Sequence, residues 1–434
     1  MSYSDFSGIS IYLLLLLAVL FFYLLSRSRK HSVAESQLKE MVDAGLTEPS
    51  SLHPEIAFHK CLGSGACVVA CPEKAIGIIG GKAVLINPTA CIGHGACMAA
   101  CPHGAITLVY GTEKRGMDIP QVNPDFETNV PGIFIAGELG GMGLIRKAAS
   151  QGSQAIDAIG KLKGSANPLD VVIIGAGPAG LAASLGAIEK KLRSVTLEQE
   201  SSLGGAIFHY PRSKIVMTAP VKLPVIGEVN MREVSKEELL EFWDGVLEKT
   251  SLKINYNERM EAITRTGSGF IVKTTRQSYE TRAVLLAIGR RGTPRKLGVP
   301  GEELPKVVYK LIDPEQYRNK HVLVVGGGDS ALEAAIAVAN EAGTTVTLSY
   351  RGEAFGRGKR KNREQLQALV AEGRITVMLK SNVKLIERDK VHMEHNGLPL
   401  EIPNDAVIVC AGGILPTPFL KEIGVMVETK FGTA

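Results

Sequence analysis

The sequence has few aromatic residues and little net charge, and each shortage excludes a class of protein. Aromatic residues make up 5% of the chain, whereas glycine is abundant and the apolar share is an ordinary 45%. This balance is typical of a globular α/β protein and excludes a disordered or fibrous one. The net charge of +5 is small and dispersed, which argues against nucleic acid as a partner.

Cysteine is missing from most of the chain, because none occurs between Cys101 and Cys410. Six of the seven cysteines lie in two short segments before that gap. A secreted disulfide scaffold distributes its cysteines along the chain. Clustered cysteines with metal-type spacing therefore indicate a reducing compartment.

Charge is missing from Ile9 to Leu25, where the sequence is ISIYLLLLLAVLFFYLL. An uncharged apolar run of this length is at the short end of what spans a bilayer. The basic stretch SRSRKH follows, so the positive-inside rule keeps the rest of the chain in the cytoplasm. We therefore expect residues 1–30 to be a single-pass anchor in the inner membrane, with cytoplasmic catalytic domains. A cleaved signal peptide is the alternative.

Two similar segments hold the clustered cysteines, CLGSGACVVACPEKAI at residues 61–76 and CIGHGACMAACPHGAI at residues 91–106. The usual bacterial iron–sulfur run is C-x2-C-x2-C-x3-C-P. Ser64 and His94 replace its second cysteine, and the other positions are kept as Cys61, Cys67, Cys71, Cys91, Cys97 and Cys101. Between the segments, IGIIGGKAVLI indicates two short strands joined by a Gly-Gly turn.

A first dinucleotide turn is predicted in DVVIIGAGPAGLAASLGA, between an apolar strand and a helix. Gly175, Gly177 and Gly180 permit a tight turn and let a pyrophosphate approach the helix N-terminus. The next strand ends at Glu198, whose carboxylate can bind both hydroxyls of an adenosine ribose. A glycine turn in an unrelated fold is the alternative.

A second turn is predicted in HVLVVGGGDSALEAA, with Gly326 and Gly328. Where the first unit has Glu198, this unit has a serine, and a basic run with Arg351 and Arg357 follows. A carboxylate would repel a 2′-phosphate, whereas arginines attract it. We therefore predict NADP(H) at this turn. The alternative for the basic run is a solvated surface loop.

Together the turns resemble those of two-dinucleotide-domain flavoprotein reductases, the thioredoxin reductase superfamily. LLAIGRRGTPR and VIVCAGGILPTPFL resemble the crossovers between their domains, and GGAIFHYPRSKIVMTAPVKLPVIGEV is similar to bacillithiol disulfide reductases. The resemblance implies FAD at the first turn and NADP at the second. Thioredoxin reductases also carry a C-x-x-C dithiol, which this chain lacks, so electrons on the flavin need another exit.

The cysteine segments resemble a two-cluster bacterial ferredoxin, in which the last cysteine of each run serves the other cluster. The resemblance implies that the ligands are grouped as Cys61, Cys67, Cys101 and as Cys91, Cys97, Cys71. Three thiolates suffice for a 3Fe-4S cluster, and a 4Fe-4S cluster needs a further ligand such as His94. We expect Ser64 to be a spectator and Glu73 and His103 to face solvent. A metal-free shell and a zinc site are the alternatives.

The segment DIPQVNPDFETNVPGIFIAGEL resembles the part that closes these flavoproteins at their C-terminus, yet it precedes the first turn. In that family the strand ends in an acid that binds the ribityl chain, which implies this role for Glu138, with Gly137 beside it as a further cofactor-binding residue. We infer a circular permutation, with residues 133–136 beside strand 171–174 and Glu138 facing the cleft of Gly175. An independent linker with a glycine-rich hairpin is the alternative.

We therefore predict an α/β protein with two doubly wound dinucleotide-binding domains, a small α+β ferredoxin-like domain and one transmembrane helix. The expected parts are a membrane anchor (1–30), a linker helix (31–53), the iron–sulfur module (54–110), the permuted closing segment (111–168), the FAD domain (169–295), the NADP domain (296–405) and a return to the FAD domain (406–434).

The predicted function is a membrane-anchored oxidoreductase that passes electrons between NADPH, FAD and iron–sulfur clusters. Nicotinamide gives two electrons as a hydride, clusters accept one at a time, and flavin converts between the two. The sequence leaves open whether the acceptor is a redox protein, a quinone or a small disulfide, and whether the chain forms a homodimer. We name no catalytic acid or base. The alternatives are a flavin-dependent small-disulfide reductase and a redox or nucleotide sensor without turnover.

Overall fold

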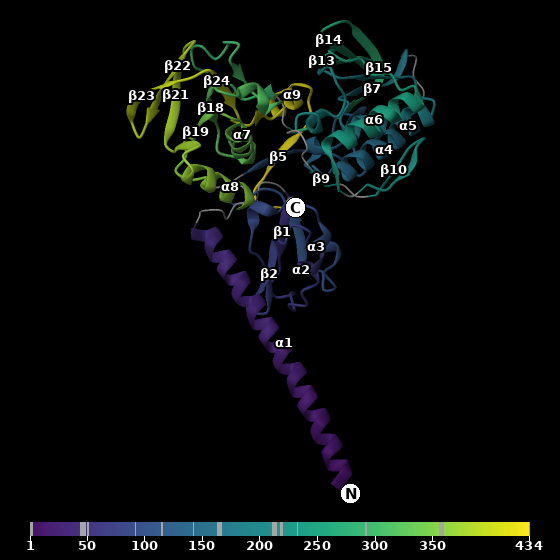
Figure 1. The fold of residues 1–434 in the computed structure, drawn as a ribbon. Coiled ribbons are helices and arrows are strands. Elements are labelled where there is room, and N and C mark those ends of the chain that lie inside the picture. Colours follow the sequence, from purple (N-terminus) through teal and green to yellow (C-terminus); the bar gives the residue numbers. More distant parts are fainter. Residues whose placement is uncertain are drawn as a thin grey trace. The chain divides into compact units, whose positions relative to one another are not determined.

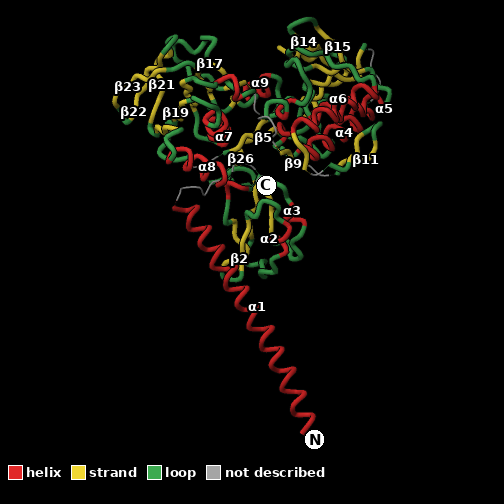
Figure 2. Tube along the Cα trace, in the orientation of Figure 1, coloured by secondary structure: helices red, strands yellow, loops and turns green. Residues whose placement is uncertain are grey.

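The computed structural model separates into two compact units, residues 1–115 with 432–434 and residues 116–431 (Figures 1 and 2). The residues that it describes are 3–43, 49, 52–91, 93–113, 116–141, 143–162, 167–210, 215–217, 220–231, 233–290, 293–355 and 360–433.

The first unit combines a long helix with a small module of paired strands. Its elements are α1 (Tyr3–Asp43), β1 (His53–Ile56), α2 (Ala66–Ala70), β2 (Ile76–Ile79), β3 (Lys82–Leu85), α3 (Ala96–Ala99) and β4 (Ile106–Val109). β1 pairs with β4 and β2 with β3, both antiparallel. The β2–β3 hairpin confirms the predicted Gly-Gly turn. Gly80 and Gly81 both have positive φ, which glycine adopts without a steric cost.

α1 is one continuous helix of 41 residues, so the expected separate linker helix at residues 31–53 does not form. Its C-terminal part packs on the module, where Ala34 and Met41 are buried and the His31 ring accepts a hydrogen bond from the Gly80 N–H. The large apolar side chains described between residues 14 and 25 are exposed. The side chains of residues 9–13 and 23 lie outside the described part.

The prediction of a membrane span requires correction. Among the residues that the structure describes, no helix has the length and apolar character needed to cross a membrane. The predicted anchor at residues 1–30, the membrane as a partner and the inner-membrane localisation with cytoplasmic domains are therefore withdrawn.

The second unit begins with the elements around the first glycine turn. They are β5 (Met117–Pro120), β6 (Ile133–Ile135), α4 (Ile145–Lys161), β7 (Leu169–Ile174), α5 (Pro178–Glu189), β8 (Ser194–Leu197), β9 (Ile215–Met217), β10 (Val221–Leu223), β11 (Gly227–Val229), β12 (Glu233–Ser235), α6 (Lys236–Thr250), β13 (Met260–Arg265), β14 (Phe270–Thr274), β15 (Ser278–Leu286) and β16 (Thr293–Pro294).

The elements around the second turn complete this unit. They are β17 (Val307–Val308), β18 (His321–Val325), α7 (Asp329–Ala339), β19 (Thr345–Ser349), α8 (Arg360–Ala371), β20 (Ile375–Met378), β21 (Ser381–Ile386), β22 (Lys390–His395), β23 (Leu398–Pro403), β24 (Ala406–Val409), β25 (Gly413–Ile414), α9 (Thr417–Glu422) and β26 (Val427–Lys430).

The first sheet of this unit follows the order β13-β14-β15-β7-β8, and β6 pairs with the end of β15. β6 shares the sheet of β7, but the predicted direct contact is wrong because β15 lies between them. Val284 of β15 is opposite Ile133 on one side and Val172 on the other, all in parallel strands. The apolar side chains at residues 171–174 of β7 are buried, as is usual for a strand that pairs in parallel on both sides.

The second sheet is parallel and has the order β17-β24-β18-β19-β20. Between β20 and β24 in the chain, β21, β22 and β23 form a separate antiparallel sheet. Apolar side chains of β18, β19 and β24 are buried against α7. Parallel strands that alternate with helices are the arrangement predicted for a dinucleotide-binding domain. The α/β class is therefore confirmed for the second unit.

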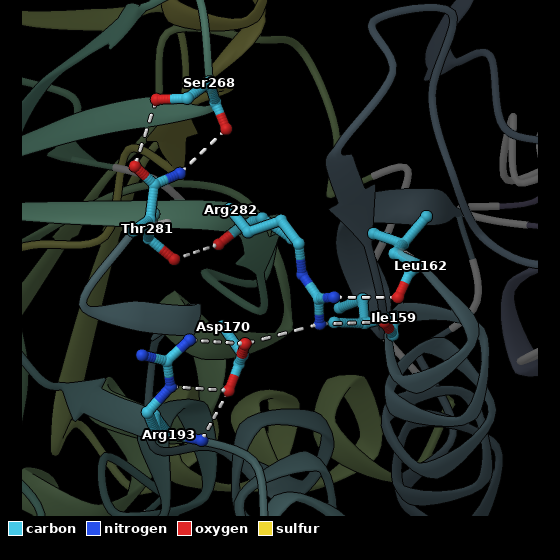
Figure 3. A network of polar contacts seen from close by, with 9 residues as sticks. Ile159, Leu162, Asp170, Arg193, Ser268, Thr281 and Arg282 are labelled. Carbon is cyan, nitrogen blue, oxygen red and sulfur yellow. Dashed lines mark hydrogen bonds and ion pairs between the residues drawn. The ribbon is translucent and has the colours of Figure 1, made fainter. Parts of the chain in front are cut away.

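Contacts between distant segments hold the beginning and the end of the second unit together. β5 pairs antiparallel with β26, so that Met117 is opposite Lys430. Figure 3 shows Arg282 of β15 donating to the Leu162 carbonyl oxygen at 2.8 Å and lying 3.7 Å from the Asp170 carboxylate. The end of α4 and the start of β7 are thereby tied to the same side chain.

Candidate cofactor and iron–sulfur sites

The turn after β7 leaves room for a ligand at the start of α5. Gly175 has a φ of +107°, and a Cβ there would lie 2.5 Å from the Ala287 carbonyl oxygen. A Cβ on Gly180 would lie 1.8 Å from the Gly175 carbonyl oxygen, so glycine lets α5 pack closely on the turn. Gly177 is the N-cap of α5. The helix N-terminus, which attracts anions, therefore lies at this turn.

Glu198 places a carboxylate beside the same turn. It follows β8, is 5% exposed and accepts a hydrogen bond of 2.7 Å from the Ala176 N–H. Its other oxygen accepts from the Glu200 N–H at 3.0 Å. These bonds fix the carboxylate where a ribose would follow a pyrophosphate bound at the helix.

Gly137 and Glu138 follow β6 and line the same cavity as Gly175 and Gly177. Gly137 has a φ of +85°, and its N–H donates to Oε1 of Gln151 on α4 at 2.8 Å. The start of α4 also lines this cavity. The segment before the first turn thus contributes a carboxylate and a helix N-terminus to the dinucleotide site.

The second turn has the same close packing. A Cβ on Gly326 would lie 2.4 Å from the Cys410 carbonyl oxygen, and Gly328 is the N-cap of α7. Ser349 ends β19, and its hydroxyl is 2.7 Å from that of Ser381, so this strand end carries no carboxylate. Arg351 is exposed and lines the cavity, whereas Arg357 lies outside the described residues.

One cavity of about 1510 Å³ runs along both turns. Its walls include the glycines of the turns, Glu198, Glu138 and Arg351. The glycines let each helix N-terminus pack closely on its turn. Carboxylates, which can bind ribose hydroxyls, and an arginine, which can bind a phosphate, line the same cavity. The residues present therefore fit a flavin and a nicotinamide dinucleotide.

The cavity also contains side chains that the sequence analysis missed. Lys310 Nζ and His209 Nε2 both lie 3.8 Å from Glu200 Oε1. The Tyr309 hydroxyl donates to Glu302 at 2.5 Å, and burial together with this bond raises the pKa of Tyr309. These residues lie on loops without a recognisable motif, so only the tertiary fold brings them to the site.

Two small cavities in the first unit each collect three cysteines. Cys61, Cys67 and Cys101 line one, which we name site 1, and Cys71, Cys91 and Cys97 line the other, site 2. These are the crossed sets that the ferredoxin resemblance implies. Glycine permits the tight loops, because a Cβ on Gly63 would lie 2.1 Å from the Gly81 carbonyl oxygen.

The replaced ligand positions lie at the same two sites. Ser64 lines site 1 and His94 lines site 2. The residues after each Cys-Pro pair also line them, His103 at site 1 and Glu73 at site 2. His103 is exposed as expected, but Glu73 is half-buried, which corrects the expectation that it simply faces solvent.

The buried cysteine thiols need a neighbouring positive charge in order to ionise. Burial raises the pKa of Cys67, Cys91 and Cys97, since a thiolate is poorly solvated there. A bound cluster supplies the positive charge that holds thiolates in such places. The Ala83 N–H donates to Cys61 Sγ at 3.4 Å, a bond that also favours thiolate. The donor set therefore fits an iron–sulfur cluster at each site.

A single metal ion is a different matter. In the described part of the chain, no group of three or more His, Cys, Asp or Glu side chains converges in a way that could hold one.

Comparison with known families agrees with both sites. The pyridine nucleotide-disulphide oxidoreductase family matches residues 172–432, and a 4Fe-4S dicluster domain matches residues 53–102. The chain therefore belongs to the pyridine nucleotide-disulphide oxidoreductase family and carries an N-terminal 4Fe-4S dicluster domain of ferredoxin type. It is an enzyme, a flavin-dependent NAD(P)H oxidoreductase with an iron–sulfur module.

Individual relatives cover the reductase unit. The chain is 28% identical over 268 residues to bacilliredoxin reductase Bdr of Bacillus subtilis, which spans 60% of this chain and 82% of that protein. It is 29% identical over 260 residues to a ferredoxin–NADP reductase of Acholeplasma laidlawii, spanning 59% and 78%. Among solved structures, bacillithiol disulfide reductase Bdr (YpdA) from Bacillus cereus superposes with a TM-score of 0.52 at 28% identity, over 59% of this chain and 82% of that one.

Proposed function

We propose that the protein takes a hydride from NADPH and delivers its two electrons singly, through FAD and two iron–sulfur clusters, to a separate one-electron acceptor. A bound flavin would supply the conversion of one hydride into two single electrons, with the protons passing to solvent and NADP⁺ leaving its site. Glu198 and Glu138 would hold the flavin dinucleotide, and Arg351 the nicotinamide dinucleotide. The observation that carries this proposal is the pair of separate three-cysteine sites joined to a reductase unit that lacks a dithiol.

Cys410 does not supply the missing dithiol chemistry. It is the only cysteine of residues 116–431. Burial, and then the charge of Glu333, raises the pKa of its thiol to about 12. A thiol that stays protonated is a poor nucleophile, so it does not relay electrons to a disulfide.

NADPH is the proposed donor because the second turn presents Arg351 in place of a carboxylate. Arg351 lines the cavity at the end of β19, where the 2′-substituent of the adenosine ribose lies in dinucleotide domains. Arg357 is proposed as a second contact on the basis of the basic run alone. Equal use of NADPH and NADH by the wild type would overturn this assignment.

Each three-cysteine site is proposed to hold a cluster, with three-iron forms accessible at both and His94 as a further ligand at site 2. Anaerobic preparation should then give at least about three irons and three sulfides per site. Zinc, or no metal after reconstitution, would contradict the proposal. His94→Ala should change the spectrum of one cluster, whereas Ser64→Ala should change neither.

The FAD domain is proposed to be circularly permuted. Three observations support this: β6 joins the sheet of β7, β5 pairs with β26, and Arg282 links the end of α4 to the start of β7. A sheet needs its strands adjacent in space and not in sequence, so the closing segment can precede the turn. Glu138 is then the proposed ribityl partner.

A second candidate function is reduction of a small disulfide directly by the flavin. Its support is the 28% identity to bacilliredoxin reductase Bdr. The two functions differ in what they require of the clusters. Disulfide turnover that survives replacement of all six clustered cysteines by serine would favour the second function, and turnover lost with the clusters would favour the first.

A further inference from the structure

The two iron–sulfur sites share the same cysteine pattern but differ in the charged side chains beside them. At site 1, Lys82 of β3 is half-buried, and its ammonium donates to the Cys61 carbonyl oxygen at 2.6 Å and to the Phe58 carbonyl oxygen at 2.9 Å. The next residue, Ala83, donates its N–H to Cys61 Sγ. Strand β3 therefore fixes a positive charge next to a site 1 ligand.

Site 2 has a negative charge instead. The half-buried Glu73 lines this cavity. Glu73 lies two residues after Cys71 and lines the cavity together with Cys71, Cys91 and Cys97, so its charge is close to the site 2 ligands. Among the described residues, no acidic side chain lines site 1 and no lysine or arginine lines either cavity. Lys82 is close to site 1 through its contact with the Cys61 carbonyl oxygen.

The internal repeat shows which residue corresponds to Lys82 at site 2. A Cβ on Gly63 would meet the Gly81 carbonyl oxygen, and one on Gly93 would meet the Leu52 carbonyl oxygen. The residue after Gly81 therefore corresponds to the residue after Leu52, which is His53 of β1. A buried histidine thus takes the place of the lysine, and the two sites have diverged at matched positions.

The first cysteines also differ in their contacts, because Cys61 Sγ accepts the Ala83 N–H at 3.4 Å whereas Cys91 Sγ donates to the Leu52 carbonyl oxygen at 3.9 Å. The last cysteine of each run has the same contact at both sites. Ala105 donates its N–H to Cys101 Sγ of site 1, and Ala75 donates to Cys71 Sγ of site 2, both at 3.4 Å. Reduction adds one negative charge to a cluster. A neighbouring cation therefore favours it and a neighbouring anion opposes it, more strongly where the charges are partly buried and less screened.

We propose that Lys82 raises the reduction potential of the cluster at site 1 and that Glu73 lowers that of the cluster at site 2. The inference rests on the proposed function, because it requires a cluster at each site. Each cluster would gain one electron from the reduced flavin, whose N–H protons would pass to solvent as it is reoxidised. The electrons settle first at site 1, and site 2 is the stronger reductant of the pair.

The test is a redox titration of the full chain followed by electron paramagnetic resonance, with the wild type, Lys82→Gln and Glu73→Gln. Lys82→Gln should lower one of the two midpoints, and Glu73→Gln should raise the other. The expected size is about a tenfold change in the one-electron equilibrium constant, which is about 59 mV. Lys82→Arg keeps the charge and should keep the midpoint. Lys60→Met removes an exposed lysine next to Cys61 and should have little effect.

The outcomes separate the inference from the proposed function. A wild type without clusters would overturn both. Clusters whose midpoints stay unmoved, move together, or respond to both variants at the same site would overturn the inference alone. If Lys82→Gln loses its cluster because the contact with the Cys61 loop is weakened, Glu73→Gln decides by raising one midpoint or leaving both unchanged.

Discussion

At the residue scale, the dinucleotide sites depend on the missing Cβ of glycine and on the charge of the side chain that follows each second strand, Glu198 in one unit and Arg351 in the other. Sequence alone predicted the glycine turns, because glycine is the residue that permits close backbone approach. It did not predict the contact between Lys82 and Cys61. These residues are 21 positions apart and meet only once the β2–β3 hairpin has folded back. The half-buried position of Glu73 likewise follows from the crossing of the two cysteine runs.

Arg351→Ala should weaken NADPH binding and leave NADH binding nearly unchanged. A charge-assisted hydrogen bond to a phosphate contributes about 1.5–3 kcal/mol, which corresponds to roughly ten- to hundredfold in affinity. Steady-state kinetics with both nucleotides measure the effect. Arg388→Ala is the control, because Arg388 is exposed and does not line the cavity. A variant with an unaltered preference for NADPH would show that Arg351 does not bind the 2′-phosphate.

Gly180→Ala should abolish stoichiometric FAD binding, because its Cβ would lie 1.8 Å from the Gly175 carbonyl oxygen and push α5 away from the turn. Gly245→Ala is the matched control. It lies in α6 with nothing within 4 Å of the added Cβ, and should stabilise the helix by about 0.5–1 kcal/mol. Flavin content and thermal unfolding measure the pair. Retention of FAD by the first variant would show that α5 need not pack so closely.

At the element scale, the sequence predicted which strands exist better than how they are ordered. The turn at Gly80 and the strands before both glycine turns were recognisable from apolar runs and from the glycines that end them. The place of β15 between β6 and β7 was not, because the segments that pair in parallel are short apolar ones, residues 284–286 in β15, and such segments can exchange places in a parallel sheet. The continuous α1 was missed because its change from apolar to polar composition suggested a boundary.

The Asp170 cluster of Figure 3 predicts a pH-dependent contribution to stability. The hydrogen bond from Arg193, together with its charge and that of Arg282, lowers the pKa of Asp170 below its ordinary value of about 3.9. The contribution is therefore present above that ordinary pKa and is lost as pH falls through the lower, folded-state pKa. Asp170→Asn should cost about 1.5–3 kcal/mol at neutral pH and progressively less in acid. Urea unfolding at neutral and at acidic pH tests this, with the exposed Asp125→Asn as control. An equal loss of unfolding free energy at the two pH values would contradict it.

The proposed permutation predicts that the reductase unit tolerates the reverse rearrangement. A chain that begins at residue 167, runs to 431, continues into 116 and ends at 162 keeps every strand neighbour of the sheet, because β26 already pairs with β5. It should bind FAD one to one, as judged by absorbance and flavin fluorescence. A matched chain that simply omits residues 116–162 should not. FAD binding by the truncated chain would show that Glu138 and α4 are dispensable.

At the scale of the whole molecule, the chain joins a flavin reductase that lacks its own dithiol to a module with two three-cysteine sites. A flavin that receives electron pairs and clusters that take single electrons together form a two-to-one electron converter. Sequence motifs and the family resemblances that they carry predicted this combination, and the family matches confirm its two parts. The predicted membrane anchor was wrong, because the described residues contain no helix able to span a membrane.

The central claim is that NADPH reduces the clusters through the flavin. An anaerobic titration of the full chain with NADPH tests it most directly, with flavin and cluster absorbance recorded together and paramagnetic resonance of the end point. Because FAD alone takes up the two electrons of one NADPH, the account predicts that the end point lies above about one equivalent per chain and that cluster signals appear. The variant with all six clustered cysteines replaced by serine should stop at about one equivalent. A wild type that also stops there, with its clusters present and still oxidised, would contradict the account.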